Sequence, residues 1–340
     1  MDPLIAFHLA VELTNRCNFS CIHCFRENNI TENPDIPVEV YEKFLKESLS
    51  YKSPYITLTG GGEPTLHQDF EAILALTARY HYAYTLITNG WTFETVYPLL
   101  DRFRTNLHTV VLSLDGATEE THDAIRQQPG SYRKVIQACM ICYYKQIPFQ
   151  LTMTVHRLNF SEIDEFLVLA SKLGATEVNL GPAQLTKKLV SKGLALSPQE
   201  RKQLHAKNLS LEENPLLPVN IGFDYFIENP CVPCYTLRMS SLLLDYDGHV
   251  RFCCQLSGYE DHAETGGLDM IEDLRQSSVW ECHRALVRKI TTFQEEKIRR
   301  IEQQTFTENE HFPCYYCAKY FHKLDWLKDF PDSEWSGDDD

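Results

Sequence analysis

The stretch Cys17-Asn18-Phe19-Ser20-Cys21-Ile22-His23-Cys24 places three cysteines on one short segment, in the spacing C-x3-C-x2-C. It directly follows residues 7–13, an apolar segment with the composition of a β-strand. Three thiolates without a fourth cysteine nearby predict an iron–sulfur cluster in which one iron stays open to a substrate or cofactor. The alternative is a zinc site completed by His23 or a distant ligand.

The composition limits the class of protein. The 340 residues include 32 Lys or Arg and 47 Asp or Glu, giving a formal charge of −15, and 43% are hydrophobic. This composition is typical of a packed globular protein, and the negative charge argues against nucleic acid as a partner. No basic signal region or membrane-length apolar stretch is present, so we expect a cytoplasmic protein with no membrane partner.

Such a location would keep most of the twelve cysteines reduced, so metal ligation is the better explanation for them than disulfides. Cys139, Cys142 and Cys282 fall in helical patterns and are most simply buried core thiols.

Short apolar runs alternate with amphipathic stretches over the first half of the chain. The predicted strands are residues 7–13, 55–59, 84–88, 109–114, 149–155 and 177–180, and the predicted helices are residues 38–48, 69–79, 94–104, 132–144 and 161–173. This α/β pattern predicts a parallel sheet covered by helices, with its active site at the carboxyl ends of the strands.

Three further motifs fall at that edge. Thr59-Gly60-Gly61-Gly62-Glu63-Pro64 follows the second strand, Thr88-Asn89-Gly90 the third, and Ser113-Leu114-Asp115-Gly116 the fourth. Glycines let a backbone approach a small molecule, and a carboxylate can pair with its ammonium group. Each motif alone could be a tight turn or a helix cap, but together they line one rim.

These motifs, in this order and spacing, resemble the radical S-adenosylmethionine (SAM) superfamily over roughly the first 180 residues. The resemblance implies a partial (β/α)6 barrel and a [4Fe-4S] cluster that binds SAM, with Cys17, Cys21 and Cys24 as its ligands. It further implies that Gly61, Gly62 and Glu63 hold the methionine ammonium and that Ser113 lies near the ribose. Arg126 could bind the SAM carboxylate, or it could be a charged residue on the solvent-exposed face of a helix. His23 stands where the family often has an aromatic residue.

The implied reaction is reductive cleavage of SAM to a 5′-deoxyadenosyl radical, which removes a hydrogen atom from a substrate. It needs a low-potential electron donor such as flavodoxin or ferredoxin.

By resemblance, the last third of the chain contains the ligands of a second metal site. A hairpin is predicted at 241–244 and 249–252, with helices at 280–289 and 293–304. A cysteine followed by Gly248-x4-Cys253 resembles the SPASM/twitch extension, which implies one auxiliary [4Fe-4S] cluster with the ligands Cys234, Cys253, Cys314 and Cys317. Cys231 is an alternative to Cys234. A zinc site of Cys231, Cys234, Cys314 and Cys317 is the competing interpretation.

Cys254 directly follows a predicted ligand, so on a hairpin its side chain points to the opposite face. Residues 247–254 resemble a segment of peptide epimerases, which use a cysteine to donate a hydrogen atom to a substrate radical. Twitch enzymes that catalyse other reactions also have paired cysteines at this position.

The expected organisation is a radical SAM core at 1–185, a connector at 186–230 with a helix at 198–206, a twitch-like domain at 231–325 with a β-hairpin and helices, and a solvated acidic tail at 326–340.

The leading hypothesis is an enzyme that modifies a ribosomally made peptide, in one version by epimerisation with Cys254. Because the cluster loop starts at residue 17, we expect no room for an N-terminal peptide-recognition domain, which weakens the peptide hypothesis. The alternatives are a dehydrogenase or epimerase of a carbohydrate or aminocyclitol, and a zinc-stabilised binding protein.

Overall fold

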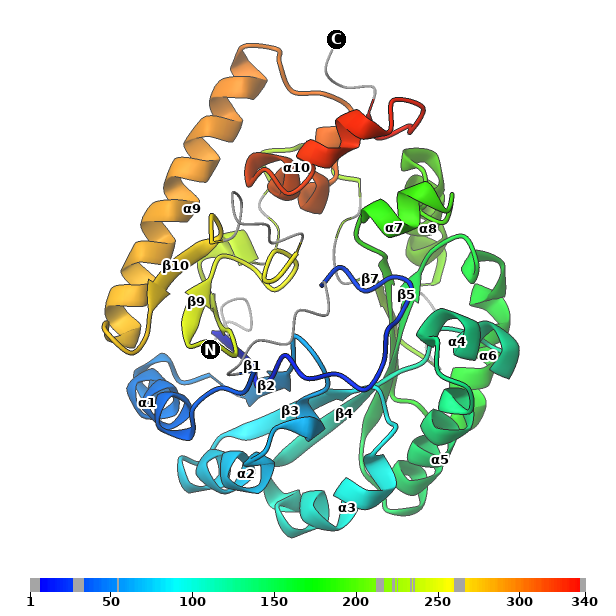
Figure 1. The fold of residues 1–340 in the computed structure, drawn as a ribbon, viewed down its shortest axis with the longest axis vertical. Helices are drawn as coiled ribbons and strands as arrows, with labels where there is room; N and C mark the ends of the chain where they lie inside the picture. The colour runs from blue at the N-terminus through cyan, green and yellow to red at the C-terminus, as the bar shows by residue number, and fades with distance from the viewer. Residues whose placement is uncertain are drawn as a thin grey trace.

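The computed structural model describes residues 7–26, 34–53, 55–211, 217–221, 224, 226–232, 234, 236–259 and 267–336. Its central feature is a curved sheet with helices on its outer side (Figure 1). The first six strands are parallel and lie in the sheet in chain order. Parallel strands in chain order with helices outside are the arrangement of a (β/α) barrel, of which this sheet is an open part. The predicted α/β class and partial (β/α)6 barrel are therefore confirmed.

The barrel elements lie close to their predicted positions. The strands are β1 His8–Glu12, β2 Tyr55–Thr59, β3 Ala83–Thr88, β4 Leu107–Ser113, β5 Phe149–Val155 and β6 Glu177–Pro182. The helices are α1 Val38–Ser48, α2 Phe70–Arg79, α3 Phe93–Arg102, α4 Glu119–Arg126, α5 Ser131–Tyr144 and α6 Ile163–Leu173. The sequence pattern predicts all of them except α4.

Alternating burial along β5 shows how the sheet is layered. Its odd-numbered residues, from Phe149 to Val155, are buried against the helices. Gln150, Thr152 and Thr154 point to the inner face and are partly exposed. Because successive side chains of a strand point to opposite faces, the apolar core lies between sheet and helices. The inner face of the barrel is left polar in this region.

The predicted hairpin is hydrogen-bonded to the barrel. It consists of β8 Ser241–Leu244 and β9 His249–Arg251, and β8 pairs in parallel with β1. An additional strand, β10 Met270–Asp273, lies beyond β9, and β7 Val219–Ile221 lies beyond β6, so the described residues form one sheet of ten strands. This pairing places the segment after β9 next to the carboxyl end of β1.

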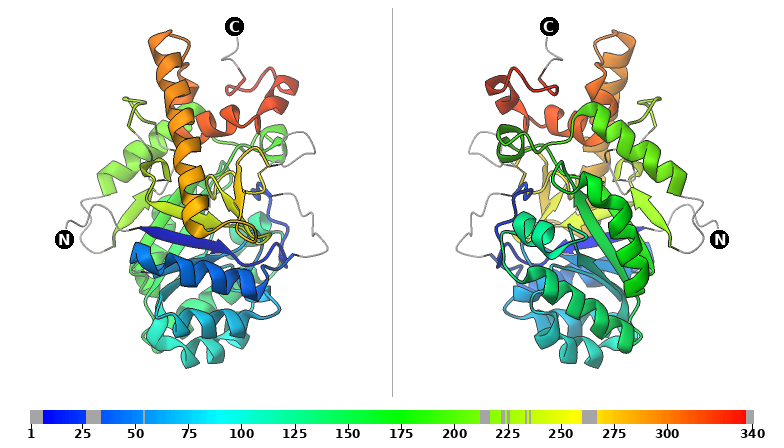
Figure 2. Two further views of the ribbon diagram at one scale, coloured as in Figure 1. Left: turned by 90° about the vertical axis from the view of Figure 1, so that its left-hand side faces the viewer. Right: turned by 90° about the vertical axis from the view of Figure 1, so that its right-hand side faces the viewer.

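One long helix, α9 Val279–Glu302, packs beside β10 where the sequence pattern predicts two shorter helices (Figures 1 and 2). The predicted break near residue 291 is wrong. The Thr291 hydroxyl donates to the carbonyl four residues earlier, and Ile290 and Phe293 on either side are fully buried. Packing of this apolar face overrides the low helix propensity of threonine. Neither α9 nor any other described helix combines the length and apolar character needed to cross a membrane.

The expectation of a solvated tail is wrong for residues 326–336. Trp326, Leu327 and Trp335 are buried, and the Trp335 indole donates to the Leu196 carbonyl at 2.9 Å. Residues 337–340 lie outside the described part. The remaining helices are α7 Lys187–Ser191, α8 Pro198–Leu211 and α10 Pro313–Tyr320. The predicted core thiols Cys139, Cys142 and Cys282 are confirmed as buried.

Candidate cluster and cofactor sites

The cysteine loop leaves the carboxyl end of β1 and packs against the glycine run that follows β2. The Gly62 amide donates to the Thr14 carbonyl at 2.9 Å, and the Glu63 amide donates to the Arg16 carbonyl at 2.7 Å. A Cβ atom on Gly62 would lie 1.9 Å from the Arg16 oxygen, so this close approach requires glycine. Two motifs that are distant in sequence thus lie side by side.

Cys17, Cys21 and Cys24 are partly exposed and act on one another electrostatically. Burial, with smaller contributions from Cys21, Glu63 and Cys24, raises the pKa of Cys17 to about 11. Without a metal this thiol is therefore protonated at neutral pH, and metal binding must displace its proton.

Three clustered thiols are a donor set that fits an iron–sulfur cluster with one open iron. No three Cys, His, Asp or Glu side chains in the described ranges converge tightly enough for a single metal ion. Cysteines of a [4Fe-4S] cluster bind separate iron atoms and do not need to meet at one point.

A buried ion pair supports the cysteine loop from the side of α4. Arg126 Nε lies 2.6 Å from Asp115 Oδ2, and Arg126 Nη1 donates to Cys21 Sγ at 3.8 Å. Both side chains of the pair are buried, so the interpretation of Arg126 as a solvated helix charge is wrong. Burial opposes ionisation of Asp115, but Arg126 and His23 outweigh it and hold its pKa below the usual value.

We expect Arg126→Met to lower the free energy of unfolding by about 3–5 kcal/mol, because Asp115 would lose its main partner in a buried position. Arg133→Met is the matched control, since Arg133 forms an exposed ion pair with Glu119 at 2.8 Å. Its effect should stay within about 0.5 kcal/mol. Urea unfolding of both variants near pH 7 measures the difference, and equal losses would contradict the importance of the Asp115 pair.

Glu63 is almost fully buried and already holds several hydrogen bonds. Its Oε1 accepts from the hydroxyls of Thr65 at 2.7 Å and Thr88 at 2.6 Å, and its Oε2 accepts from the Asn89 amide at 2.7 Å. These contacts tie the glycine run to the end of β3. Because a carboxylate oxygen has two lone pairs, Oε2 can still accept one further donor, which fits an ammonium group.

Arg26 and Glu12 form a buried ion pair that the sequence analysis does not predict. Arg26 Nη1 is buried without a hydrogen-bond partner among the described residues, and a Cβ on Gly61 would lie 2.2 Å from it. An orphaned guanidinium nitrogen beside a glycine run fits the carboxylate of a bound amino acid. An acid within the apolar strand β1 is the sequence signal that could have indicated this pair.

The same pair joins the cysteine loop to the segment after β9. The Ser257 hydroxyl donates to Glu12 Oε2 at 2.9 Å, and Arg26 forms an isolated β-bridge with Tyr259. Ser113, predicted near the ribose of SAM, is partly exposed at the end of β4 and lies in register with Thr152 of β5.

The four cysteines predicted for the auxiliary cluster come together from three segments. Burial raises the pKa of Cys314 well above its usual value, and Cys253, Cys317 and Cys234 add to this shift. Burial likewise raises the pKa of Cys317, with Cys234 and Cys253 as the next contributors. Cys234 and Cys253 each act on both Cys314 and Cys317, so the donor set fits a four-thiolate cluster. The alternative ligand Cys231 is exposed.

Buried polar groups hold α10 in place beneath this site. The Cys314 amide donates to Asp224 Oδ1 at 2.9 Å, and Asp224 forms a buried ion pair with Arg201 of α8. Arg201 Nη2 also donates to the Ala183 carbonyl at 2.8 Å, directly after β6. This chain of contacts connects the barrel rim to the auxiliary cysteines.

Cys254, the predicted hydrogen donor, is exposed. A hydrogen bond with the Cys253 side chain lowers its pKa, and Glu12, Cys314 and Arg26 also act on it. It is therefore near both the Glu12–Arg26 pair and the auxiliary cysteines.

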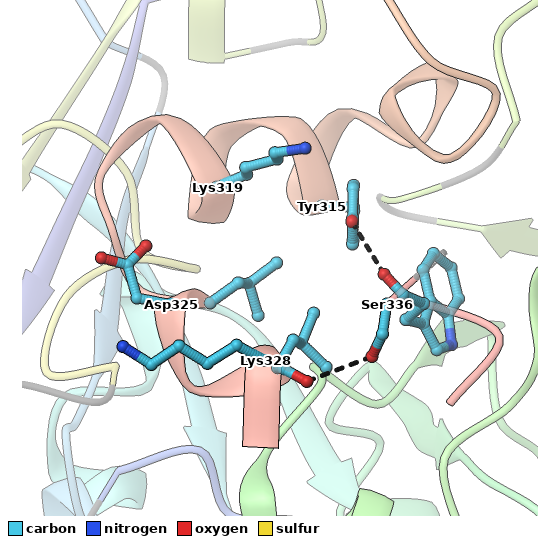
Figure 3. A pocket seen from close by; sticks show the side chains of 8 residues that line it. Tyr315, Lys319, Asp325, Lys328 and Ser336 are labelled. Carbon is cyan, nitrogen blue, oxygen red and sulfur yellow. Dashed lines mark hydrogen bonds between the residues drawn. The ribbon is translucent and has the colours of Figure 1, made fainter. Parts of the chain in front are cut away.

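A cavity of about 320 Å³ lies beside α10 (Figure 3). Tyr315, Lys319, Lys328 and Ser336 are among its lining residues. The Tyr315 hydroxyl donates to the Trp335 carbonyl at 3.0 Å at its edge. None of the cysteines predicted as ligands lines this cavity.

Residues 11–170 match the Radical SAM superfamily, and this part of the chain is a radical SAM domain. Among curated relatives, the AdoMet-dependent heme synthase of Methanosarcina barkeri is 30% identical over 49% of this chain and 48% of that protein. The mycofactocin maturase MftC of Mycobacterium tuberculosis is 31% identical over 49% of this chain and 42% of that protein. The matched region is thus under half the length of each relative.

A solved structure of similar fold is that of Streptococcus suis SuiB bound to the precursor peptide SuiA. It has a TM-score of 0.59 at 12% identity and covers 81% of this chain and 64% of SuiB. At this identity the similarity establishes a shared fold. It covers more of the chain than the family match over residues 11–170.

Proposed function

We propose that this protein is a radical SAM enzyme that reductively cleaves SAM and removes a hydrogen atom from its substrate with the resulting 5′-deoxyadenosyl radical. The observation that carries this proposal is the packing of the three-cysteine loop against the glycine run, beside the orphaned Arg26 Nη1. When bound, a [4Fe-4S] cluster at Cys17, Cys21 and Cys24 supplies a low-potential electron from a donor such as flavodoxin or ferredoxin.

The groups around the glycine run have the chemistry to orient SAM. Gly61 and Gly62 keep the rim free of side chains, and Glu63 Oε2 retains an acceptor position for the methionine ammonium. Arg26 Nη1 is a buried donor for the methionine carboxylate, while Arg126 is held at Cys21 by Asp115. In this proposal Ser113 contacts the ribose from the end of β4.

We further propose one auxiliary [4Fe-4S] cluster at Cys234, Cys253, Cys314 and Cys317. Its support is the mutual electrostatic influence of these thiols. The corresponding organisation is a core at 1–185, a connector at 186–230 and an auxiliary-cluster domain at 231–325, with β8 of that domain hydrogen-bonded to β1 of the core.

The substrate class that we propose is a ribosomally made peptide. Gln150, Thr152 and Thr154 give the inner barrel face amide and hydroxyl groups, which can pair with peptide backbone groups. The relative MftC is a maturase by name, and the fold is shared with SuiB, which was solved with a precursor peptide. A carbohydrate or aminocyclitol also suits a polar lining and is the second candidate. Epimerisation, with Cys254 as hydrogen donor, is one version of either reaction.

Metal analysis tests this proposal against a zinc-stabilised binding protein. We expect anaerobically reconstituted protein to be brown and to contain about eight iron and eight sulfide ions per chain, from two [4Fe-4S] clusters. Zinc offered in equal amount during reconstitution should not replace the iron. A colourless protein with stoichiometric zinc and no labile sulfide would refute both cluster assignments.

A further inference from the structure

Lys297 of α9 is a buried lysine held against the auxiliary cysteine segment. Only 4% of its surface is exposed. Its Nζ lies 5.2 Å from the centroid of the Tyr316 ring and 5.6 Å from that of Phe306. Tyr316 stands between Cys314 and Cys317 on α10, so the ammonium group is positioned over the C-x2-C segment itself.

No carboxylate of the described residues forms an ion pair with Lys297. The nearby acid, Glu310, is instead engaged by Arg300, whose Nη2 donates to Glu310 Oε2 at 2.8 Å, and by Lys319 at 3.7 Å. Burial lowers the pKa of Lys297, whereas Cys317, Cys234 and Cys231 act in the opposite direction. The groups that oppose this lowering most are thus cysteine side chains, ahead of Glu310.

A buried ammonium without a counter-ion is costly, and contacts with two aromatic rings offset only part of that cost. A four-thiolate iron–sulfur cluster carries a net negative charge, which increases by one unit when the cluster is reduced. The nearby positive charge therefore stabilises both oxidation states, and the reduced state more.

We propose that Lys297 is the counter-charge of the auxiliary cluster and raises its reduction potential. This inference rests on the auxiliary cluster of the proposed function. Lys297 is a positioning residue that acts on the cluster through its charge, and no contact with substrate is required.

The test is a spectroelectrochemical titration of full-length protein in which Cys17, Cys21 and Cys24 are all Ala, so that only the auxiliary cluster is observed. Lys297→Met and Lys297→Gln should make reduction at least about tenfold less favourable, a shift of about 59 mV to lower potential for a one-electron couple. Lys297→Arg should restore the potential. Lys289→Met is the matched control, because Lys289 is on the same helix, 5.7 Å from the Phe321 ring, and donates to the Leu268 carbonyl.

The outcomes separate this inference from the proposed function. If the protein with Cys17, Cys21 and Cys24 replaced by Ala holds no cluster, the auxiliary-cluster proposal itself is wrong. If the cluster is present and the Met and Gln variants titrate at the parent potential, Lys297 does not tune it. If both neutral variants lose the cluster and Lys297→Arg keeps it, the positive charge is required and the inference stands. If Lys297→Arg loses it as well, side-chain shape is required and the inference is overturned.

Discussion

Replacement of Cys17, Cys21 and Cys24 together by Ala is expected to abolish SAM cleavage and to remove about half of the bound iron. The three side chains are partly exposed at the end of β1, so their loss leaves the barrel core intact. The remaining iron belongs to the site at Cys234, Cys253, Cys314 and Cys317. Iron and sulfide analysis, with assay of 5′-deoxyadenosine, measures both effects.

The control for that variant removes cysteines that have no proposed ligand role. Cys139 and Cys142 are fully buried on α5, so Cys139→Ala with Cys142→Ala should keep the iron content and SAM cleavage of the parent protein. Its cost is a stability loss of about 1 kcal/mol per residue. Loss of all iron from the Cys17, Cys21 and Cys24 variant, with its fold retained, would contradict a separate auxiliary cluster.

Cys254→Ala is expected to abolish the epimerised product while hydrogen abstraction from the substrate continues. In the epimerising reaction the Cys254 S–H bond breaks and its hydrogen atom forms a C–H bond on the substrate radical. The resulting thiyl radical takes one electron from the reductant in the assay and one proton from water before the next turnover. A reaction in heavy water should therefore place one deuteron on the product.

Cys254→Ser is the matched variant for this prediction, because a hydroxyl keeps the shape of the side chain but does not readily give up a hydrogen atom. It should also yield no epimerised product. An oxidative enzyme would instead pass the electron of the substrate radical to the auxiliary cluster and add no deuteron. Unchanged product from either folded variant would refute the donor role of Cys254 and favour oxidation.

Local patterns were sufficient to predict the barrel. β2 and β5 begin and end at the predicted residues because each is a run of β-branched and apolar residues bounded by turn residues. β7 and β10 are three and four residues long and lie outside the predicted runs, so no periodic signal distinguishes them from loops. The sequence pattern predicts two helices where the structure has the single helix α9, because burial of Phe293 keeps the helix continuous across the threonines that precede it.

The cysteine loop and the glycine run were predictable because each is a local motif, and the auxiliary cysteines, which lie on three segments, were predicted from their resemblance to a family pattern. The spacing of Cys17, Cys21 and Cys24 is a property of one loop, and the glycine run is a property of another. The Arg26–Glu12 pair and the placement of Lys297 over Tyr316 depend on contacts between distant segments. A basic residue on an amphipathic helix is usually solvated, so no pattern in α9 identifies Lys297 as buried.

Formation of 5′-deoxyadenosine tests the central claim most directly. Anaerobically reconstituted protein, given SAM and a strong low-potential reductant, should form 5′-deoxyadenosine, and the variant with Cys17, Cys21 and Cys24 replaced by Ala should form none. Fully reconstituted protein that forms no 5′-deoxyadenosine, or a triple variant that still forms it, would contradict the assignment of a radical SAM reaction to this loop.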